Sequence, residues 1–560
     1  MATADTLAAD EKEPREPDQA EPPGSDAPQP AGRPPRDRRA DVLRLASHVA
    51  VVIPFAFGTI RAMLRGWSPL GDTATITLRS WEVFGAYAPL VGQRTGLANT
   101  YDLGPLEYWL LSVPVRLDPQ HGVLWGAAIW AIVAAWLSIE AARRAFGLRG
   151  CVLTSALIVA AVAASPQTAD GVAWNPHLGM LWFFAVLTGA CAVYRGQRNW
   201  WPVLVLAASI AMQCHLMYAF TSLALVLITG VMSLLGAKRD GGRYTFAVVG
   251  VAVAVVGWIA PVVQELTGHP GNMTLLVSKG QGHDLGAIFG LKTFMETVFP
   301  PVLWWHDLQS GNPHHVLQLI DDGYFPLVVV ALAMVVAPFF VGRRYNSQGL
   351  RAISAVSMVS CLGVVVTFSE LSRAGSGAIT WMIAVVFPVG VIAWIALIWA
   401  ACLVVKARPP LDRPARDYRT AYLRASRGVA GGVVVLTAVT AVAVVEVNAG
   451  IPTAYAWQLI PAVQQTASRI ESTFPPGSVY IHVKGNISHD FRYAVTEGIA
   501  YQLQQAGYHP EVSGFPALPA LGGHYGPTHQ ASSVLVDVTQ KGQETSVKLQ
   551  FHKHVSANSS

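Results

Sequence analysis

The chain has 560 residues, of which 52% are hydrophobic and only 13% are charged, and its formal net charge is +5. A soluble globular protein carries about 25% charged residues, so this composition excludes a soluble enzyme. The apolar residues stand in long blocks, many of about 18 residues or more, which is the length that a membrane-spanning helix needs. The basic residues lie in short clusters between these blocks, which indicates a polytopic membrane protein and no nucleic-acid partner.

Residues 1–41 are rich in Pro, Ala, Asp, Glu and Arg and contain few large apolar residues. This composition predicts a disordered tail. The tail ends in the basic sequence "RPPRDRRAD" directly before the first apolar block, and the positive-inside rule places such a cluster in the cytoplasm. The polar N-terminus shows no cleavable signal peptide.

A transmembrane domain over 42–447 is predicted, with about eleven spans. Every basic loop falls on one side if the N-terminus is cytoplasmic and the C-terminal part is extracytoplasmic. The stretch 199–235 is long for one helix, so we predict a hairpin that turns near His215. The segment 106–118 is short and contains Pro114, which favours a juxtamembrane or re-entrant piece. The predicted spans are 43–64, 122–142, 150–166, 177–194, 199–213, 216–235, 244–266, 324–341, 350–369, 376–404 and 428–447.

This topology places the polar residues of greatest chemical interest on the outer face. The two longest external loops are 65–121 and 267–323. Loops that converge on one face of a helical membrane protein and carry acids, His and Trp predict an active site at the membrane surface. The residues concerned are Asp72, Arg79, Asp102, Glu107, Asn175, His177, His215, His306 and Asp307.

The C-terminal segment 448–560 has a different pattern. The sequences at 478–483, 532–540 and 546–552 alternate like strands, and 490–508 has the pattern of an amphipathic helix that ends at a glycine. Strand–helix–strand alternation predicts a small α/β domain, which the topology places outside the cell. The segment contains no glycine-rich phosphate loop and no nucleophile motif, which favours a docking or support role.

The first external loop carries a distinctive order of features. Asp72 follows the first span by about eight residues and precedes a predicted amphipathic helix, "ATITLRSWEVFGAYAPLVG", after which comes "NTYDLGPLEYWLL" (99–111). This order resembles the GT-C superfamily of integral membrane glycosyltransferases. In that superfamily the loop carries an essential acid and closes with a His-Pro-Pro or His-Pro-Gly-Pro type motif. The corresponding sequence here is "YDLGPL" (101–106), which lacks the usual His and has Asp102 nearby.

Further motifs are similar to members of this superfamily that build bacterial cell envelopes. They are "WNPH" (174–177), "MQCH" (212–215) and "WWHD" (304–307), together with the α/β tail after the last span. The resemblance implies an all-α polytopic GT-C fold in the bacterial cytoplasmic membrane. It also implies transfer of a mannose or arabinofuranose type of sugar from a polyprenyl-phosphate donor to a glycan, glycolipid or protein acceptor in cell-wall biogenesis.

The resemblance assigns Asp72 as the general base of an inverting displacement. A carboxylate at the membrane surface can take the proton of an attacking hydroxyl, while cations or hydrogen-bond donors stabilise the departing lipid phosphate. Arg79, Arg94, His215 or Lys279 could supply those donors. Aromatic rings suit sugar faces. The remaining candidates for substrate binding are Asp102, Glu107, Asn175, His177, Trp304, Trp305, His306 and Asp307.

Each candidate residue also has a structural interpretation. Asp72 could cap the helix that begins at Thr73, and Asp102 could cap the turn at Gly104-Pro105. Glu107 could form an ion pair, and His215 could be a buried, hydrogen-bonded histidine. Trp304 and Trp305 could be interfacial anchors. A divalent cation held by Asp72, Asp102, His215 and Asp307 is an open alternative, although no ligand spacing supports it and no other cofactor is predicted.

Two other functions compete with glycosyl transfer. A transporter or flippase of lipid-linked saccharides would show internal repeats and ionisable residues at the membrane midplane, whereas the acids here cluster in external loops. A non-catalytic scaffold that binds glycan through its external domain is the second alternative. The missing His before Gly104-Pro105 fits a degenerate site of that kind.

Overall fold

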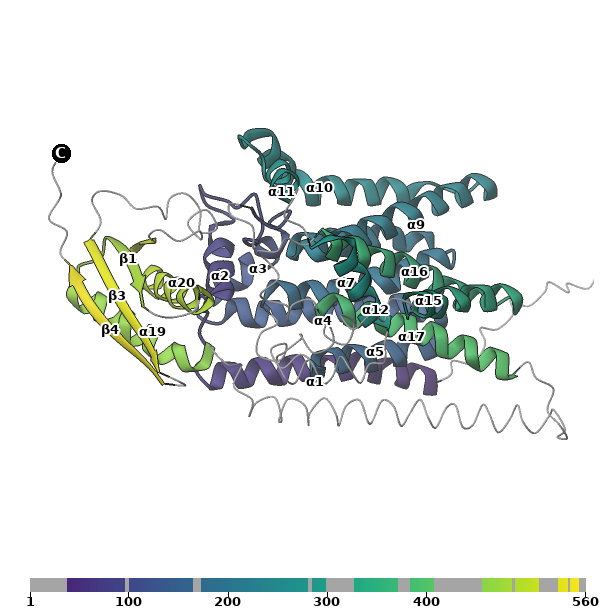
Figure 1. Cartoon of the computed structure of the whole chain (residues 1–560), viewed down its shortest axis with the longest axis horizontal. Helices are drawn as coiled ribbons and strands as arrows, with labels where there is room; N and C mark the ends of the chain where they lie inside the picture. Colours follow the sequence, from purple (N-terminus) through teal and green to yellow (C-terminus); the bar gives the residue numbers. More distant parts are fainter. Residues whose placement is uncertain are drawn as a thin grey trace, which may run out of the picture.

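The computed structural model describes residues 38–95, 100–164, 173–280, 285–298, 327–370, 383–406, 456–485, 489–512, 532–541 and 544–552. A bundle of long helices lies along the main axis, and a small α/β unit sits at one end of it (Figure 1). Helix α1 (Arg38–Leu64) begins inside the predicted tail, so residues 38–41 are helical rather than disordered. The rest of that tail and the predicted domain boundary at 448 lie outside the described residues.

Within the described residues, eight helical segments are long and apolar enough to cross a membrane by length and composition. Two shorter helices, α5 (Leu148–Ala164) and α8 (Trp201–Cys214), also correspond to predicted spans. The polytopic architecture is therefore confirmed, while the predicted span at 428–447 lies outside the described residues. The eight are α1, α4 (Gly122–Phe146), α7 (Asn175–Tyr194), α9 (Ala219–Asp240) with the short helix η2 (Leu216–Tyr218) before it, α10 (Thr245–Thr267), α15 (Leu327–Arg344), α16 (Gln348–Ser369) and α17 (Ile383–Lys406).

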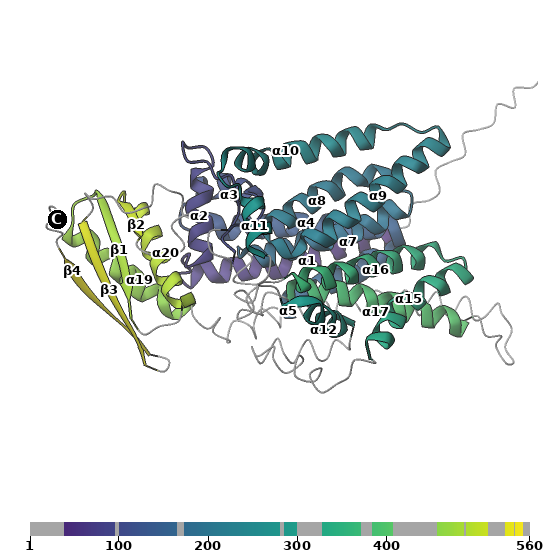
Figure 2. The ribbon, with the colours of Figure 1, turned by 45° about the horizontal axis from the view of Figure 1, so that its top comes forward.

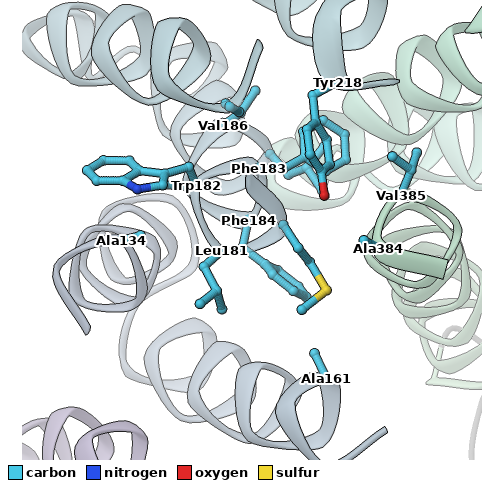
Figure 3. Packing of buried hydrophobic residues seen from close by; sticks show 14 of the residues in the cluster. Ala134, Ala161, Leu181, Trp182, Phe183, Phe184, Val186, Tyr218, Ala384 and Val385 are labelled. Carbon is cyan, nitrogen blue, oxygen red and sulfur yellow. The ribbon is translucent and has the colours of Figure 1, made fainter. Parts of the chain in front are cut away.

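Helix α7 forms the centre of the bundle. Its side chains Leu181, Trp182, Phe183 and Phe184 are all buried, and Figure 3 shows them pointing in different directions around the helix, towards neighbours such as Tyr218. A helix that is apolar on every side is one that other helices surround. In a bilayer this close packing, rather than removal of apolar surface from water, holds the helices together. The N-terminal end of α7 is consequently a fixed point of the structure.

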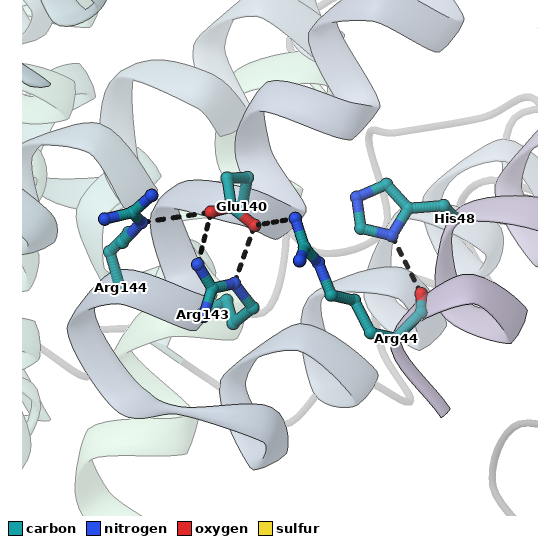
Figure 4. A network of polar contacts seen from close by, with 5 residues as sticks. All are labelled: Arg44, His48, Glu140, Arg143 and Arg144. Carbon is teal, nitrogen blue, oxygen red and sulfur yellow. Dashed lines mark hydrogen bonds and ion pairs between the residues drawn. The ribbon is translucent and has the colours of Figure 1, made fainter. Parts of the chain in front are cut away.

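The end of α4 and the start of α1 are joined by a charged cluster (Figure 4). The carboxylate of Glu140 accepts hydrogen bonds from Arg44 at 3.2 Å, from Arg143 at 2.7 Å and from Arg144 at 3.0 Å. His48 hydrogen-bonds the Arg44 carbonyl oxygen at 2.8 Å. This cluster lies at the end of the bundle away from the α/β unit, where the sequence places the cytoplasm. The sidedness itself stays a prediction.

The α/β unit is built from α19 (Ala456–Thr473), β1 (Ser478–Lys484), α20 (His489–Gln505), β2 (His509–Val512), β3 (Ser532–Lys541) and β4 (Glu544–His552). The strand order is β2-β1-β3-β4, in which β1 pairs parallel with β2 and β3 while β3 and β4 are antiparallel. Alternate residues of β1 are buried, as a strand with one covered face requires. The predicted α/β architecture is confirmed, and α19 and β2 are elements that the sequence did not predict.

Two short helices connect the bundle to this unit. Helix α2 (Asp72–Glu82) ends ten residues before the predicted amphipathic helix does, because Gly85 and Pro89 interrupt it and the Gly85 amide donates to Glu82 in a turn. Helix α3 (Leu106–Leu117) has 12 residues, or about 18 Å of helix, and is too short to cross a bilayer core of about 30 Å. Its length fits the juxtamembrane or re-entrant piece that the sequence predicts, and its place relative to the membrane stays a prediction.

The long loop 267–323 contains two helices that the sequence did not predict. Helix α11 (Asn272–Gly280) follows α10, and α12 (Gly286–Val298) packs against α16 and α17. Helix α10 itself lies along the edge of the bundle and contacts α8 (Figure 1). The contacts of α12 with α16 and α17 join this loop to the bundle.

Candidate active site

Asp72 is the first residue of α2, and both of its carboxylate oxygens are hydrogen-bonded. Gln93 Nε2 donates to Oδ1 at 2.8 Å, and Trp174 Nε1 donates to Oδ2 at 2.8 Å. The helix has no side-chain N-cap, and the preceding Gly71 adopts a positive φ of 52°. Instead, the Thr73 hydroxyl links the first turn of α2 to the preceding chain, because it accepts a hydrogen bond from the Leu70 amide at 3.0 Å. The carboxylate of Asp72 therefore does not serve as a helix cap.

The amide of Gln93 is fixed at both ends. Tyr108 Oη donates to Gln93 Oε1 at 2.9 Å, which directs the amide nitrogen towards Asp72. The Gln93 backbone carbonyl accepts from the Asp102 amide at 2.7 Å, so the two sides of the loop pair like short strands. The loop that carries Asp102 is thereby held beside Asp72.

Asp102 is buried and anchors the turn between α8 and η2. Its Oδ1 accepts from the Leu216 amide at 2.8 Å, and its Oδ2 accepts from Asn175 Nδ2 at 3.2 Å. Asn175 Nδ2 also donates to the Cys214 carbonyl at 2.9 Å. Burial raises the pKa of Asp102 well above its ordinary value, and the nearby charge of Asp72 adds to this effect. Asp102 therefore holds the chain at His215 and does not cap the Gly104-Pro105 turn.

The motif "WNPH" connects the two acids. Trp174 binds Asp72, the next residue, Asn175, binds Asp102, and the His177 ring packs edge-on against the Trp174 ring with centroids 4.8 Å apart. We call Asp72, Gln93, Asp102, Trp174 and Asn175 the acid cluster. The structure thus brings together Asp72, Asp102, Asn175, His177 and the turn at His215, as the sequence predicts.

Glu107 and His215 lie beside the acid cluster. Glu107, on α3, is 3% exposed, and its Oε1 has no hydrogen-bond partner among the described residues. Burial, with the charges of Asp102 and Asp72, raises the pKa of Glu107 well above its ordinary value. His215 Nδ1 accepts from the Met217 amide at 3.3 Å, and burial lowers the pKa of His215 to about 4. The imidazole of His215 is therefore neutral at pH 7 and can donate a hydrogen bond but adds no positive charge.

The two arginines that are candidates for phosphate binding differ in their surroundings. Arg79, on α2, forms a buried ion pair with Glu82. The buried Nε of Arg94 has no hydrogen-bond partner within the described ranges. Arg94 is therefore the better placed of the two to bind an incoming anion, because Arg79 already has a carboxylate partner.

Part of the predicted site cannot be placed. Trp304, Trp305, His306, Asp307 and the side chain of Lys279 lie outside the described residues. Within the described part of the chain, no group of three or more His, Cys, Asp and Glu side chains could hold a metal ion. Asp307 lies outside the described residues, so the divalent-cation alternative stays a prediction.

Several residues of this region were not predicted from the sequence. The side-chain amide of Asn272, on α11, pairs with both backbone groups of Tyr101 at 2.9 and 3.0 Å, and so holds the strand that leads to Asp102. Gln213 joins α8 to the Gly257 carbonyl of α10 at 2.8 Å. Trp174 and Gln213 lie inside the motifs "WNPH" and "MQCH" that the sequence singled out, although neither residue was assigned a role. Asn272 is a neutral amide in a long loop, and sequence spacing offered no way to find it.

Comparison with known proteins gives a structural match only. No protein-family model matches the sequence, and no curated protein matches it. The crystal structure of ArnT from Cupriavidus metallidurans bound to undecaprenyl phosphate aligns with a TM-score of 0.50 at 16% identity, covering 92% of this chain and 98% of that one. The same protein in the apo state aligns with a TM-score of 0.50 at 17% identity, covering 91% and 97%. The chain therefore shares the fold of ArnT.

Proposed function

We propose that the protein is a membrane glycosyltransferase that moves a sugar from a polyprenyl-phosphate donor to an acceptor at the outer face of the cytoplasmic membrane. The observation that carries this proposal is the arrangement of Asp72. It begins the first helix after the first span, and two donors from distant parts of the chain orient its carboxylate. The shared fold with ArnT, which was crystallised with undecaprenyl phosphate, supports the same conclusion.

The chemistry assigned to Asp72 is general base catalysis. The acceptor hydroxyl attacks the anomeric carbon, its proton passes to the Asp72 carboxylate, and the bond from that carbon to the phosphate oxygen breaks with its electron pair. Polyprenyl phosphate leaves from the opposite face, so the anomeric configuration inverts. The N–H groups of Gln93 and Trp174 fix the carboxylate in one orientation, which reduces the reorganisation needed in the transition state.

The other residues divide into positioning and binding roles. Asp102 and Asn175 hold the turn at His215 relative to Asp72, and we assign them to positioning. Arg94 and the neutral His215 are proposed to bind the departing phosphate, with Arg94 supplying the charge. Binding of the sugar is proposed for His177 and for the aromatic and polar residues Trp304, Trp305, His306 and Asp307.

The identity of the sugar and of the acceptor follows from the sequence resemblance alone. Mannose or arabinofuranose is the proposed sugar, and an envelope glycan, a glycolipid or a protein is the proposed acceptor. Membrane lipids surround the helical domain, and the α/β domain is proposed to lie outside the cell. A panel of donors and acceptors is therefore part of any test.

The test uses the full chain, purified and reconstituted in lipid vesicles with polyprenyl-phosphate mannose, polyprenyl-phosphate arabinofuranose and related donors. Transfer to each acceptor is measured for the wild type and for Asp72→Asn, which is expected to lose about 10²- to 10⁴-fold in kcat. Asp240→Asn is the matched control, because Asp240 is an ion-paired acid with 58% of its side chain exposed.

Three outcomes contradict the proposal in different ways. Undiminished transfer by Asp72→Asn would remove Asp72 as the base. Absence of transfer with every donor, together with saturable movement of a lipid-linked saccharide across the vesicle membrane, would identify a transporter. Glycan binding without either activity would identify a scaffold.

A further inference from the structure

The α/β domain reaches the acid cluster through α20. This helix lies against α2 (Figure 2), and the two approach closely. A Cβ atom on Gly71 would lie 3.5 Å from the Cα of Ala494, and one on Gly498 would lie 2.4 Å from a Leu70 methyl group. The distance at Gly71 is an ordinary van der Waals contact, whereas the distance at Gly498 leaves no room for a side chain, so the glycine at 498 lets the two domains meet. Polar groups of α20 therefore come within reach of the first turns of α2.

On α20, Tyr493 makes polar contacts with Thr75 and Gln93, and Gln93 in turn binds Asp72. The Tyr493 hydroxyl lies 2.9 Å from Thr75 Oγ1, and it accepts from Gln93 Nε2 at 3.4 Å. The same Gln93 nitrogen donates to Asp72 Oδ1 at 2.8 Å. An amide nitrogen carries two hydrogens: one is directed to Asp72 Oδ1, and the other is shared between Tyr493 Oη and the Asp72 backbone carbonyl, which lies 3.5 Å from the same nitrogen. With Tyr108 on the amide oxygen, every polar atom of the Gln93 side chain has a defined partner.

Glu497 follows Tyr493 by one helical turn and is fully buried. Neither of its carboxyl oxygens has a hydrogen bond within the described residues. Burial, and after it the charge of Asp72, raise the pKa of Glu497 well above its ordinary value, while Thr75 and Arg94 oppose this effect. Burial of this carboxyl group costs folding free energy, which its interaction with the Thr75 side chain offsets only in part. It adds a second polar group from α20 to the surroundings of Asp72.

We propose that Tyr493 is a positioning residue for Asp72 that acts through Gln93, and that the α/β domain therefore contributes to the active site. This inference rests on the proposed function, because it takes Asp72 as the base. When α20 is docked on α2, the Tyr493 hydroxyl holds the Gln93 amide in the orientation in which its nitrogen donates a hydrogen bond to Asp72. Without that hydroxyl, Gln93 keeps its bond to Tyr108 but loses one of the restraints on its nitrogen.

The experiment compares Tyr493→Phe with Tyr501→Phe in the reconstituted full chain. Tyr501 lies on the same helix, about two turns after Tyr493, and donates one hydrogen bond of 2.8 Å to the Pro119 carbonyl. Each variant removes one hydroxyl from the domain contact. Tyr493→Phe is expected to lower kcat about 10-fold with little change in the KM for the donor, and Tyr501→Phe is expected to change kcat less than about 2-fold. Equal losses in the two variants would overturn the proposal.

A double-mutant cycle tests the route through Gln93. Gln93→Leu alone should lower kcat, and adding Tyr493→Phe to it should cost less than about 2-fold, because the intermediary is already absent. Additive losses would mean that Tyr493 acts by another route, which would overturn the assignment.

A measurement without substrate separates this inference from the proposed function. Hydrogen–deuterium exchange of the peptide covering 72–82 should be faster in Tyr493→Phe than in Tyr501→Phe or the wild type. Equal exchange would overturn the positioning role whatever the activity is. Loss of transfer in Asp72→Asn with normal transfer in Tyr493→Phe would also overturn it, while leaving the proposed function in place. A wild type that transfers no sugar would refute the proposed function, and the exchange result would still decide whether Tyr493 restrains α2.

Discussion

The indole of Trp174 donates a hydrogen bond of 2.8 Å to Asp72 across 102 positions of sequence. The residue after Trp174 binds Asp102, so one end of the central helix sets the spacing of two acids from the first loop. Because α7 is buried on every side, this end cannot move without repacking the bundle. The placement of Asp72 is therefore determined by the rigid interior of the protein as much as by its own loop.

The bond between Trp174 and Asp72 gives the first prediction. Trp174→Phe keeps an aromatic ring near His177 but removes the N–H donor, and we expect kcat for sugar transfer to fall about 10- to 100-fold because the carboxylate can rotate. The control is Trp125→Phe, which removes a similar bond of 3.2 Å from Trp125 Nε1 to Asp118. Similar kcat values for the two variants would show that the Trp174 bond has no catalytic effect.

The second prediction concerns the Gly-Pro turn, whose usual histidine is absent. A Cβ atom on Gly104 would lie 2.2 Å from Gln213 Oε1 and 2.6 Å from Pro261 Cγ. We expect Gly104→Ala to destabilise the protein by about 1–3 kcal/mol, read as a lower Tm in detergent. Gly189→Ala is the control, since its Cβ would meet Leu204 at an ordinary distance of 3.6 Å. A Tm for Gly104→Ala at or above that of the control would contradict the steric role of Gly104.

The third prediction is a pH dependence of stability that arises from Glu497. Its pKa is raised in the folded protein, so the folded chain binds more protons than the unfolded chain above the unfolded pKa of about 4.3. Stability is then greatest below that pH and falls as the pH rises towards the folded pKa. Glutamine does not ionise, so Glu497→Gln should have a higher Tm than the wild type at pH 8.

The Tm difference between Glu497→Gln and the wild type should become smaller as the pH is lowered to about 4, where the carboxyl group of residue 497 is largely protonated in both the folded and the unfolded wild-type chain. Each pKa unit of difference between folded and unfolded protein corresponds to about 1.4 kcal/mol. Glu471→Gln, on the exposed side of α19, provides the control for a change of charge alone. If the Tm difference between Glu497→Gln and the wild type stays constant over this pH range, the predicted contribution of Glu497 to the pH dependence of stability is wrong.

The sequence predicted the membrane helices well, because long apolar blocks have few alternative structures. The hairpin at His215 could be predicted because basic loops lie on both sides of a segment that is too long for one helix. Strand β2 was missed because it is short, contains Pro510 and exists by virtue of its pairing with β1. The end of α2 was misplaced because apolar periodicity continues past Gly85, where the backbone turns.

The acids of the site and Asn175 were accessible to sequence reasoning, whereas Gln93 and Tyr493 were not. A carboxylate in an apolar chain is conspicuous, and Asp72 and Asp102 stand out for that reason. Gln93 and Tyr493 are common neutral residues, 400 positions apart, and their contact exists only once α20 lies on α2. Such contacts form only in the tertiary structure, and no local sequence pattern predicts them.

Helix α2 belongs to two hydrophobic cores. Leu70, Ala74 and Leu78 on one side pack with the α/β domain, and Ile76 on the other side packs with the bundle. In space, the first external loop is thus a component of the C-terminal domain, although hundreds of residues separate them in sequence. A soluble fragment made for structural or binding work would need residues 67–82 fused to it, since without them the apolar side chains that pack against Leu70, Ala74 and Leu78 would be exposed to water.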